Sequence, residues 1–349
     1  MAPVLDVDSG RRHVLALPGE VGPEVLEILA RSRFPRAAWQ AVDPASRKFG
    51  PLSTRARPTP VAVLRLSRLS TVVGPYTVDR GTTAHTGLPT GTAYLIDAPV
   101  ERGGRPWPVG GDRNGLRRAF PEGLPVRDEG RVLDWAIAVA RRLGGTVRTA
   151  GPDGRPGVLL TPDPAAAVDL TVWSDLWLDP DAVLAVMRRA LPRAYLNLPT
   201  GAWAGSPPGT GERVVPGAEA LTSEQRTALH AAADAFDRAA LENPAPLQAF
   251  GALADLDLDG MIALEVSGET TLPPVVASLP WAARGAVAYR VRWEAADLHD
   301  LESERPSLLH RVARGRAAPL VVAIARAVHA AVSGEITDTM DFVVDPADL

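Results

Sequence analysis

The sequence predicts an α+β fold made of two similar units, each a split βαβ (ferredoxin-like) arrangement with a mixed or antiparallel sheet. Short apolar runs typical of strands alternate with amphipathic helices along the chain, and one helix–strand–strand pattern occurs twice. Between the two occurrences lies a Gly/Pro-rich stretch followed by an alanine-rich helix. We therefore expect an N-terminal α+β domain at residues 1–203, a linker at 204–218 and a C-terminal α+β domain at 219–349.

The composition is that of an ordinary globular protein, and it excludes several chemistries. The 349 residues include 37 basic and 41 acidic side chains, for a formal net charge of −4, and 46% of the residues are apolar. This balance gives no general attraction to nucleic acid or to an anionic membrane. Cysteine is absent, which excludes disulfide scaffolds, zinc ribbons, iron–sulfur ligation and a cysteine nucleophile. Nearly all the basic residues are arginine, a bias typical of a GC-rich bacterial genome.

The first elements follow from short apolar runs and from the residues that interrupt them. A helix is predicted over residues 23–32, because Pro23 favours the first turn and apolar residues then recur at helical spacing. Apolar or alternating runs predict strands at His13–Leu17, Ala38–Val42, Val61–Ser67 and Ala93–Ala98.

Two long polar segments, residues 74–92 and 99–115, are predicted to be loops. Both are rich in turn-forming residues and contain few large apolar side chains. Loops of this length inside a compact domain are either functional or mobile. We therefore expect a site in the N-terminal domain to be built from these two segments.

Helix boundaries are better marked in the second part of the chain. Apolar residues recur at helical spacing in a helix that ends at Gly144, namely Val132, Trp135, Val139 and Leu143. Asp179 is a predicted cap for a second helix that has Pro180 at its first position. Thr222 and Gln225 form a capping box at the start of the alanine-rich helix at about 222–241.

The remaining predicted elements are mainly strands. Helices are expected at residues 273–279 and 319–332, and strands at Thr146–Thr149, Val158–Thr161, Asp169–Ser174, Ala194–Leu198, Met261–Val266, Ala286–Trp293, Glu335–Thr339 and Asp341–Val344. The most apolar stretch, residues 320–332, contains Arg326 and is too short to cross a bilayer. The first residues carry acids where a signal peptide has a basic region, so a cytoplasmic location is expected.

An internal repeat is predicted from two pairs of similar segments. Residues 132–162 and 321–346 each contain an amphipathic helix, a glycine, a short strand, a turn and an apolar triplet. Residues 169–198 and 261–293 form the second pair, and the two pairs occur in opposite order in the two halves. Chance similarity is the alternative, because short strands and helices use few residue types.

One acidic motif matches the start of a calcium-binding loop. Asp255, Asp257 and Asp259, followed by Gly260, have the spacing of the first EF-hand ligands. The position that supplies the bidentate carboxylate in such a loop is Val266 in this chain. We therefore favour an acidic turn that leads into a strand, and predict no metal site.

The candidate ligand-binding residues lie in the two long polar segments or directly after the second one. Arg113, Arg117 and Arg118 follow a glycine-rich turn, and backbone amides together with guanidinium groups bind phosphates or carboxylates. His85 and Asp112 are the candidate acid–base residues of an enzyme that would use segments 79–92 and 110–118. A solvated surface loop is the alternative interpretation for both segments.

Two functions from different classes remain open. The first is a non-catalytic binding, regulatory or interaction protein, because the sequence lacks the motifs of metal sites, phosphate-binding loops and activated nucleophiles. Its expected partner is another protein or a second copy of the chain, and no cofactor is predicted. The second is an enzyme or small-molecule binder that acts on a phosphate or carboxylate. Neither function involves nucleic acid or a membrane.

Overall fold

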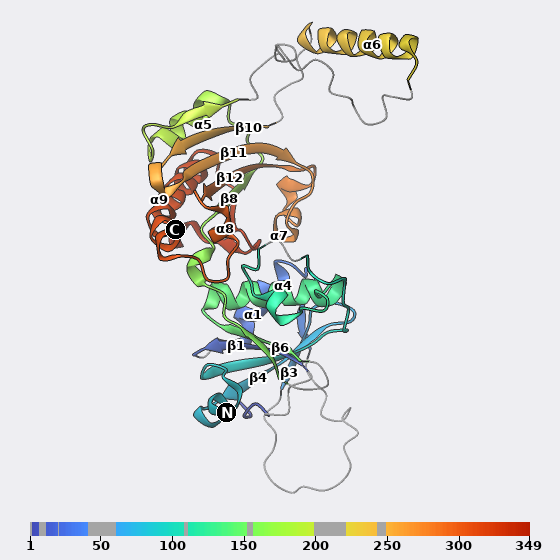
Figure 1. The fold of residues 1–349 in the computed structure, drawn as a ribbon. Coiled ribbons are helices and arrows are strands. Elements are labelled where there is room, and N and C mark those ends of the chain that lie inside the picture. The colour runs from blue at the N-terminus through green and yellow to red at the C-terminus, as the bar shows by residue number, and fades with distance from the viewer. Residues whose placement is uncertain are drawn as a thin grey trace, which may run out of the picture.

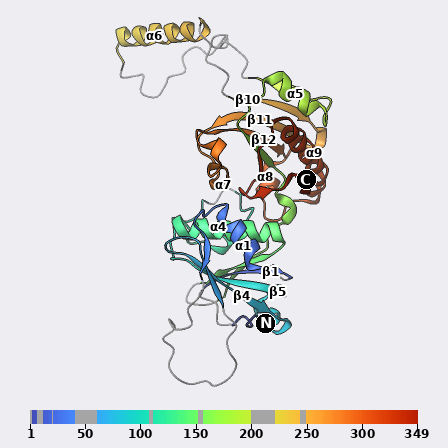
Figure 2. The same cartoon turned by 180° about the vertical axis from the view of Figure 1, so that it is seen from behind.

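The computed structural model describes residues 2–6, 12–19, 21–40, 61–107, 111–151, 156–198, 221–242 and 249–349. Within these ranges the chain has two antiparallel sheets of seven strands each and nine α-helices (Figure 1). The α+β class predicted from the sequence is confirmed. Figure 2 shows the same layers from behind.

The first sheet contains the strands of the N-terminal part of the chain. Its spatial order is β2-β3-β4-β5-β1-β6-β7, and neighbouring strands run antiparallel. The strands are β1 (His13–Pro18), β2 (Ala38–Gln40), β3 (Ala62–Arg65), β4 (Thr71–Val78), β5 (Gly91–Asp97), β6 (Thr146–Ala150) and β7 (Pro156–Leu160).

The second sheet contains the remaining strands. Its spatial order is β14-β13-β8-β12-β11-β10-β9, and its neighbouring strands are antiparallel as well. The strands are β8 (Leu170–Ser174), β9 (Tyr195–Asn197), β10 (Ala249–Asp255), β11 (Met261–Glu269), β12 (Ala286–Glu294), β13 (Glu335–Asp338) and β14 (Val343–Val344).

The two sheets have the same strand order when the strands of each are numbered from its own first strand. Segments 132–162 and 321–346, paired in the sequence, both end in the two strands at one edge of a sheet, β6-β7 and β13-β14. Segments 169–198 and 261–293 lie instead at different places in one sheet. A split βαβ unit requires a parallel pair, whereas every described pair of strands is antiparallel, so the ferredoxin-like arrangement is not confirmed.

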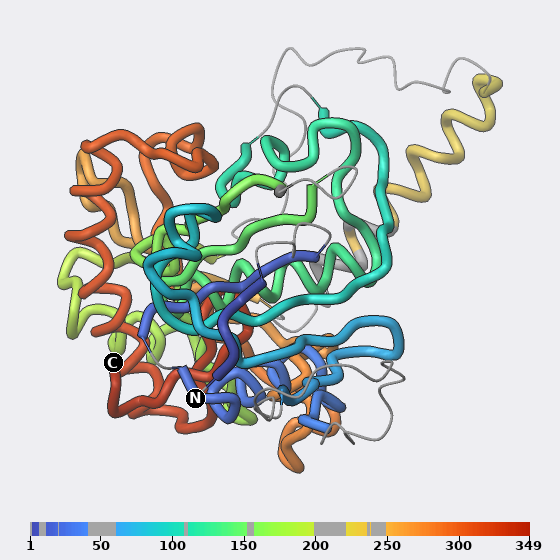
Figure 3. The backbone as a smooth tube through the Cα atoms, turned by 90° about the horizontal axis from the view of Figure 1, so that it is seen from below, coloured from blue at the N-terminus to red at the C-terminus, as the bar shows by residue number. Residues whose placement is uncertain are grey.

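The division between the sheets lies earlier in the chain than the division expected from composition. Strands β8 and β9 precede residue 203, yet β8 pairs with β12 and β9 pairs with β10 in the second sheet. The expected linker at 204–218 lies outside the described residues. Helix α6 (Ser223–Glu242) follows it, and the reciprocal hydrogen bonds of Thr222 and Gln225 confirm the predicted capping box. Figure 3 shows α6 standing apart from both sheets.

Two helices cover one face of the first sheet. Helices α1 (Pro23–Arg31) and α4 (Arg127–Leu143) bury their apolar faces against β1, β4 and β5, and Trp135 is among the largest fully buried side chains. The opposite face carries a smaller apolar cluster that includes Leu5 and Leu88. The side of α4 that points away from the first sheet faces the second unit, as Figure 1 shows.

Helices α5 (Pro180–Arg188) and α9 (Leu308–Val332) cover one face of the second sheet. Their apolar residues pack against β8, β11 and β12 in the largest core cluster. Among the described helices, α9 alone is long and apolar enough to cross a membrane by length and composition. Its buried residues, such as Val321 and Ile324, face this core.

The turn between β13 and β14 joins the two units. Phe342, at 0% exposure, belongs to the core of the first unit although its neighbours in sequence pair in the second sheet. Arg33 donates a hydrogen bond from Nε to the Met340 carbonyl oxygen at 3.0 Å, and Arg142 forms an ion pair with Asp338 at 3.0 Å. These contacts fix the second sheet against α1 and α4.

Two predicted segments differ from the structure. Residues 74–92, expected to be a loop, contain the end of β4, helix α2 (Arg80–Thr86) and the start of β5. Asp79 accepts a hydrogen bond from the Thr82 backbone N–H and so caps α2. Segment 99–115 has no helix or strand in its described part, 99–107 and 111–115, and leads into the short helix α3 (Leu116–Ala119).

Gly334, two residues after the end of α9, is expected to tolerate no side chain without a loss of stability. Its φ is +95°, and a Cβ atom there would overlap the carbonyl oxygen of Trp173 on β8. We expect Gly334→Ala to lower the free energy of unfolding by about 2 kcal/mol. Gly315→Ala is the control, because Gly315 lies within α9 and no atom lies within 4 Å of its Cβ position. This variant should raise the free energy of unfolding by up to about 1 kcal/mol. Chemical denaturation measures both, and equal effects would contradict the expected overlap.

Candidate functional site

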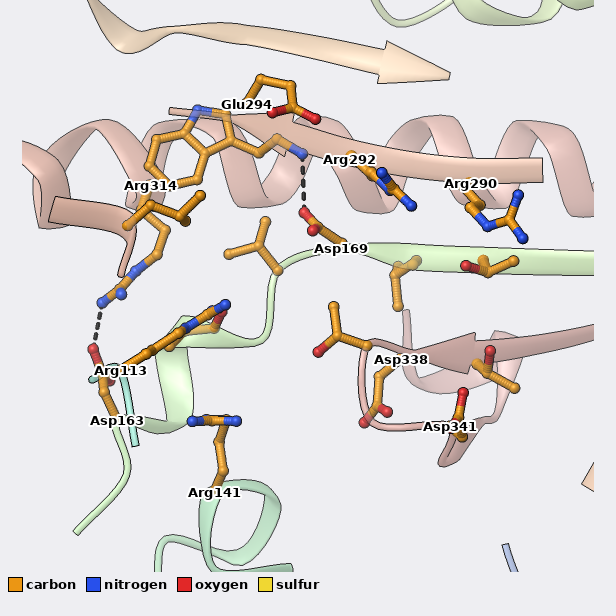
Figure 4. A pocket seen from close by; sticks show the side chains of 18 of the residues that line it. Arg113, Arg141, Asp163, Asp169, Arg290, Arg292, Glu294, Arg314, Asp338 and Asp341 are labelled. Carbon is orange, nitrogen blue, oxygen red and sulfur yellow. Dashed lines mark hydrogen bonds and ion pairs between the residues drawn. The ribbon is translucent and has the colours of Figure 1, made fainter. Parts of the chain in front are cut away.

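A cavity of about 690 Å³ lies between the two units. Its walls come from the connection before α3, the end of α4, the connection from β7 to β8, strands β8 and β12, helix α9 and the end of β13. Short helices α7 (Pro274–Ala277) and α8 (Leu298–Leu301) border it. Figure 4 shows that charged residues converge on it from both units. Five of the described residues that line it are arginines: Arg113, Arg141, Arg290, Arg292 and Arg314.

Arg141 is the most deeply buried of the cavity arginines. It lies in the last turn of α4 and is 4% exposed. Its Nη2 donates to the Asn114 side-chain oxygen at 2.5 Å, its Nη1 lies 3.6 Å from the Met340 sulfur, and its Nε has no hydrogen-bond partner. Burial, followed by repulsion from Arg113, lowers the pKa of Arg141 to about 10. The guanidinium remains charged at neutral pH and lacks a full set of acceptors.

Arg113 approaches the same place from the connection before α3. Its Nη2 donates to the backbone oxygen of Ala166, and Figure 4 shows Arg141 pointing toward it from below. Burial lowers the pKa of Arg113, whereas Asp169 raises it. Among the described residues, no carboxylate oxygen lies within ion-pair distance of Arg113 or Arg141. Two adjacent guanidinium groups thus face the cavity without a carboxylate partner.

Arg314 on α9 is paired. Its Nη2 lies 2.5 Å from the Asp163 carboxylate, which also accepts the Ala165 backbone N–H at 3.0 Å. His310, one turn earlier, packs against the Trp293 ring at a centroid distance of 5.0 Å. Burial and then the charge of Arg314 lower the pKa of His310, so its neutral form is favoured.

Asp169 also lines the cavity, at the start of β8. Its Oδ1 accepts the backbone N–H of Trp293 at 2.9 Å. Burial raises the pKa of Asp169, and the Trp293 hydrogen bond and Arg113 oppose this rise. The carboxylate therefore holds β8 to β12 and forms no direct ion pair with Arg113.

Arg290 and Arg292 project from the face of β12 that α9 does not cover. Arg290 forms an ion pair with Glu269 at 2.7 Å, and Arg292 pairs with Glu265 at 3.4 Å. Both carboxylates lie on β11, the strand that pairs with β12. Residues two apart on a strand lie on the same face, so Arg290 and Arg292 share one face of β12.

Two acidic residues, Asp338 and Asp341, lie at the far side of the cavity. Asp338 pairs with Arg142 and accepts the backbone N–H groups of Met340 and Phe342 at 2.8 and 3.0 Å. Burial raises the pKa of Asp341, and Arg33 opposes this rise. Asp169, Glu294 and Asp341 also line the cavity and, among the described residues, form no ion pair. The adjacent guanidinium groups of Arg113 and Arg141 nevertheless form a local positive pair, which suits an anionic ligand.

The structure separates the residues proposed from sequence. Arg113 lines the cavity, whereas the Asp112 carboxylate accepts the backbone N–H groups of Arg117 and Arg118 at 3.0 Å and so stabilises the first turn of α3. Arg117 donates to the Trp107 carbonyl oxygen, and Arg118 forms an ion pair with Glu304 at 2.6 Å. His85 is exposed on α2, with Nδ1 2.8 Å from the Gly81 oxygen, and lines neither described cavity.

The acidic motif forms the turn between β10 and β11. Asp255 accepts the Asp257 backbone N–H at 2.8 Å, and Asp259 pairs with Arg316 at 3.3 Å. Gly260 has a φ of +91°, which permits the turn. Within the described residues, no three His, Asp or Glu side chains are grouped as in a metal site.

Sequence reasoning missed Arg141, Arg314 and Asp169. A signal for Arg141 was available, because it lies four residues after the buried Ile137 and therefore falls on the apolar stripe of α4. Asp169 and Arg314 carry no comparable local signal, since their partners lie far away in the sequence. The chain matches no protein-family model, no curated protein and no solved structure.

Proposed function

We propose that this protein is a non-catalytic binding protein that takes a small carboxylate or phosphate into the cavity between its two units. The observation that carries the proposal is the pair Arg113 and Arg141, whose guanidinium groups face the cavity without a carboxylate partner. Burying such a charge unpaired costs free energy, and a bound anion with bidentate geometry would offset that cost. Binding in the cytoplasm is part of the proposal.

The position of the cavity suggests how binding would act on the protein. Arg113 and Arg141 belong to the first unit, whereas the opposite wall belongs to the second. A ligand there would add contacts between the units to those of Phe342 and Arg142. A ligand that binds only the folded protein at a hundredfold excess over Kd adds about 2.7 kcal/mol to the free energy of unfolding.

An interaction surface is the second candidate function. Three apolar residues in the first turns of α9 are exposed: Leu308 at 69%, Leu309 at 73% and Val312 at 41%. The same helix carries His310 and Arg314 into the cavity wall. In a regulatory protein, a ligand in the cavity could change how a partner binds to the exposed apolar residues of the same helix.

The test uses inorganic phosphate and succinate as probes on the full chain. We expect both to raise the melting temperature and to give measurable heats of binding. Arg113→Gln and Arg141→Met should each weaken binding at least tenfold, because each removes a charged donor from the cavity. Without ligand, Arg141→Met should unfold at the same or a higher denaturant concentration, since it removes a buried, incompletely paired charge.

Arg105→Gln is the matched control for the loss of one positive charge. Its side chain is 73% exposed and pairs with Glu122 outside the cavity. This variant should bind both probes as the unmodified protein does. Failure of both probes to bind, or undiminished binding by Arg141→Met, would contradict the proposed function.

A further inference from the structure

Arg141 lies between the large cavity and a second, smaller one. The second cavity has a volume of about 350 Å³ and lies where α4 approaches α9. Four residues line both cavities: Arg141, Val168, Leu170 and Asp338. The two cavities therefore adjoin at these residues, and the buried Arg141 guanidinium lies where they meet.

The second cavity has a more apolar lining than the large one. The lining of the second cavity is mainly hydrocarbon, with Ala138, Val168, Leu170, Ala318, Val322, Met340, Val344 and Leu349. Its other charged residues, Arg142 and Asp338, pair with each other at 3.0 Å. Among the side chains of the described residues that line the second cavity, Arg141 thus carries the one charge that forms no ion pair.

We propose that the ligand is an amphiphilic anion, a carboxylate with an unbranched hydrocarbon chain. Its carboxylate would bind Arg113 and Arg141, and its chain would occupy the second cavity. This inference rests on the proposed function and adds the ligand class to it. A fully polar ligand leaves the apolar cavity unused, whereas a hydrocarbon chain displaces water from it and gains free energy with each buried methylene.

The first experiment compares straight-chain carboxylates by calorimetry on the full chain. Acetate, butyrate, hexanoate and octanoate are titrated below their micellar concentrations, with inorganic phosphate as the probe without a chain. We expect Kd to fall about two- to fourfold for each added methylene, the range for partial to complete burial, until the cavity is filled. A Kd that does not change with chain length would overturn the inference.

A variant that fills the second cavity tests where the chain lies. Ala318 lines the cavity from α9, and Ala318→Phe should weaken octanoate binding at least tenfold while leaving phosphate binding within twofold. Ala323→Phe is the matched control, because Ala323 lies on the exposed side of the same helix and lines neither described cavity. It should leave binding of both probes unchanged.

The outcomes separate this inference from the proposed function. Phosphate binding that depends on Arg113, without a gain from chain length, keeps the proposed function and overturns the amphiphilic ligand. Loss of octanoate binding in both phenylalanine variants overturns the assignment of the chain to the second cavity. If neither phosphate nor any carboxylate binds, both proposals are wrong. The chain-length series uses the unmodified protein, so it remains decisive if Ala318→Phe does not fold.

Discussion

Replacing Phe342 with alanine is expected to lower the free energy of unfolding by about 3–5 kcal/mol. Phe342 is fully buried in the core of the first unit, yet it belongs to the turn between two strands of the second sheet. Its removal leaves a cavity at the place where the units meet, and the helices around that place cannot close it without moving. We therefore expect Phe342→Ala to lose more stability than Gly334→Ala.

Val343→Ala is the control for this prediction. Val343 is the next residue, 37% exposed, and its truncation should cost less than about 1 kcal/mol. Urea denaturation followed by circular dichroism measures both variants. If Phe342→Ala and Val343→Ala have equal midpoints, Phe342 does not join the units as the structure indicates.

Local sequence signals predicted the ends of several helices correctly. Asp179 caps α5 by accepting the Ala182 backbone N–H at 2.8 Å, and Pro180 occupies its first turn, as predicted. Helix α9 shows the limit of such signals, because it begins at Leu308 and not at the predicted Pro319. Ser307 accepts the His310 N–H as its cap, and the exposed Pro319 is tolerated within the helix.

The sheets could not be predicted from the same signals. Strand β10 was missed, because alanine, glycine and aspartate weaken its apolar–polar alternation. Its hydrogen-bonded pairing with β11 stabilises the strand despite this weak local preference. The membership of β8 and β9 in the second sheet depends on hydrogen bonds to strands that lie far away in the sequence. Composition marks a polar stretch and carries no information about such pairing.

Of the anion-binding residues proposed from sequence, Arg113 alone lines the candidate cavity. Arg113, in a Gly/Arg-rich segment, lines the cavity, and its role in anion binding stays a prediction. Arg117 and Arg118 have the same local pattern but bind a backbone oxygen and Glu304 instead. Which of three neighbouring arginines faces the cavity depends on the docking of the second unit, and no local pattern encodes that docking.

A second large effect is expected from His13, which is buried in the first unit at 4% exposure. Its Nδ1 accepts the Ala150 backbone N–H at 2.9 Å, and its Nε2 lies 3.2 Å from the Glu129 carboxylate, which also pairs with Arg102. An Nδ1 atom that accepts a hydrogen bond is unprotonated, so the neutral ring is the form that fits. Burial, assisted by Arg102, lowers the pKa of His13 to about 4.

This lowered pKa predicts a loss of stability in acid. The unfolded chain binds a proton at His13 near pH 6.5, whereas the folded protein binds it only near pH 4, so the free energy of unfolding decreases as pH falls between these values. His13 alone should account for about 2 kcal/mol between pH 7 and pH 5. His13→Gln keeps a neutral donor near Glu129 and removes the titrating group.

Denaturation of both proteins at pH 7, 6 and 5 should therefore show a steeper decline of the free energy of unfolding in the unmodified protein. Parallel declines would mean that His13 titrates normally, and that its hydrogen bond from Ala150 does not hold the neutral ring.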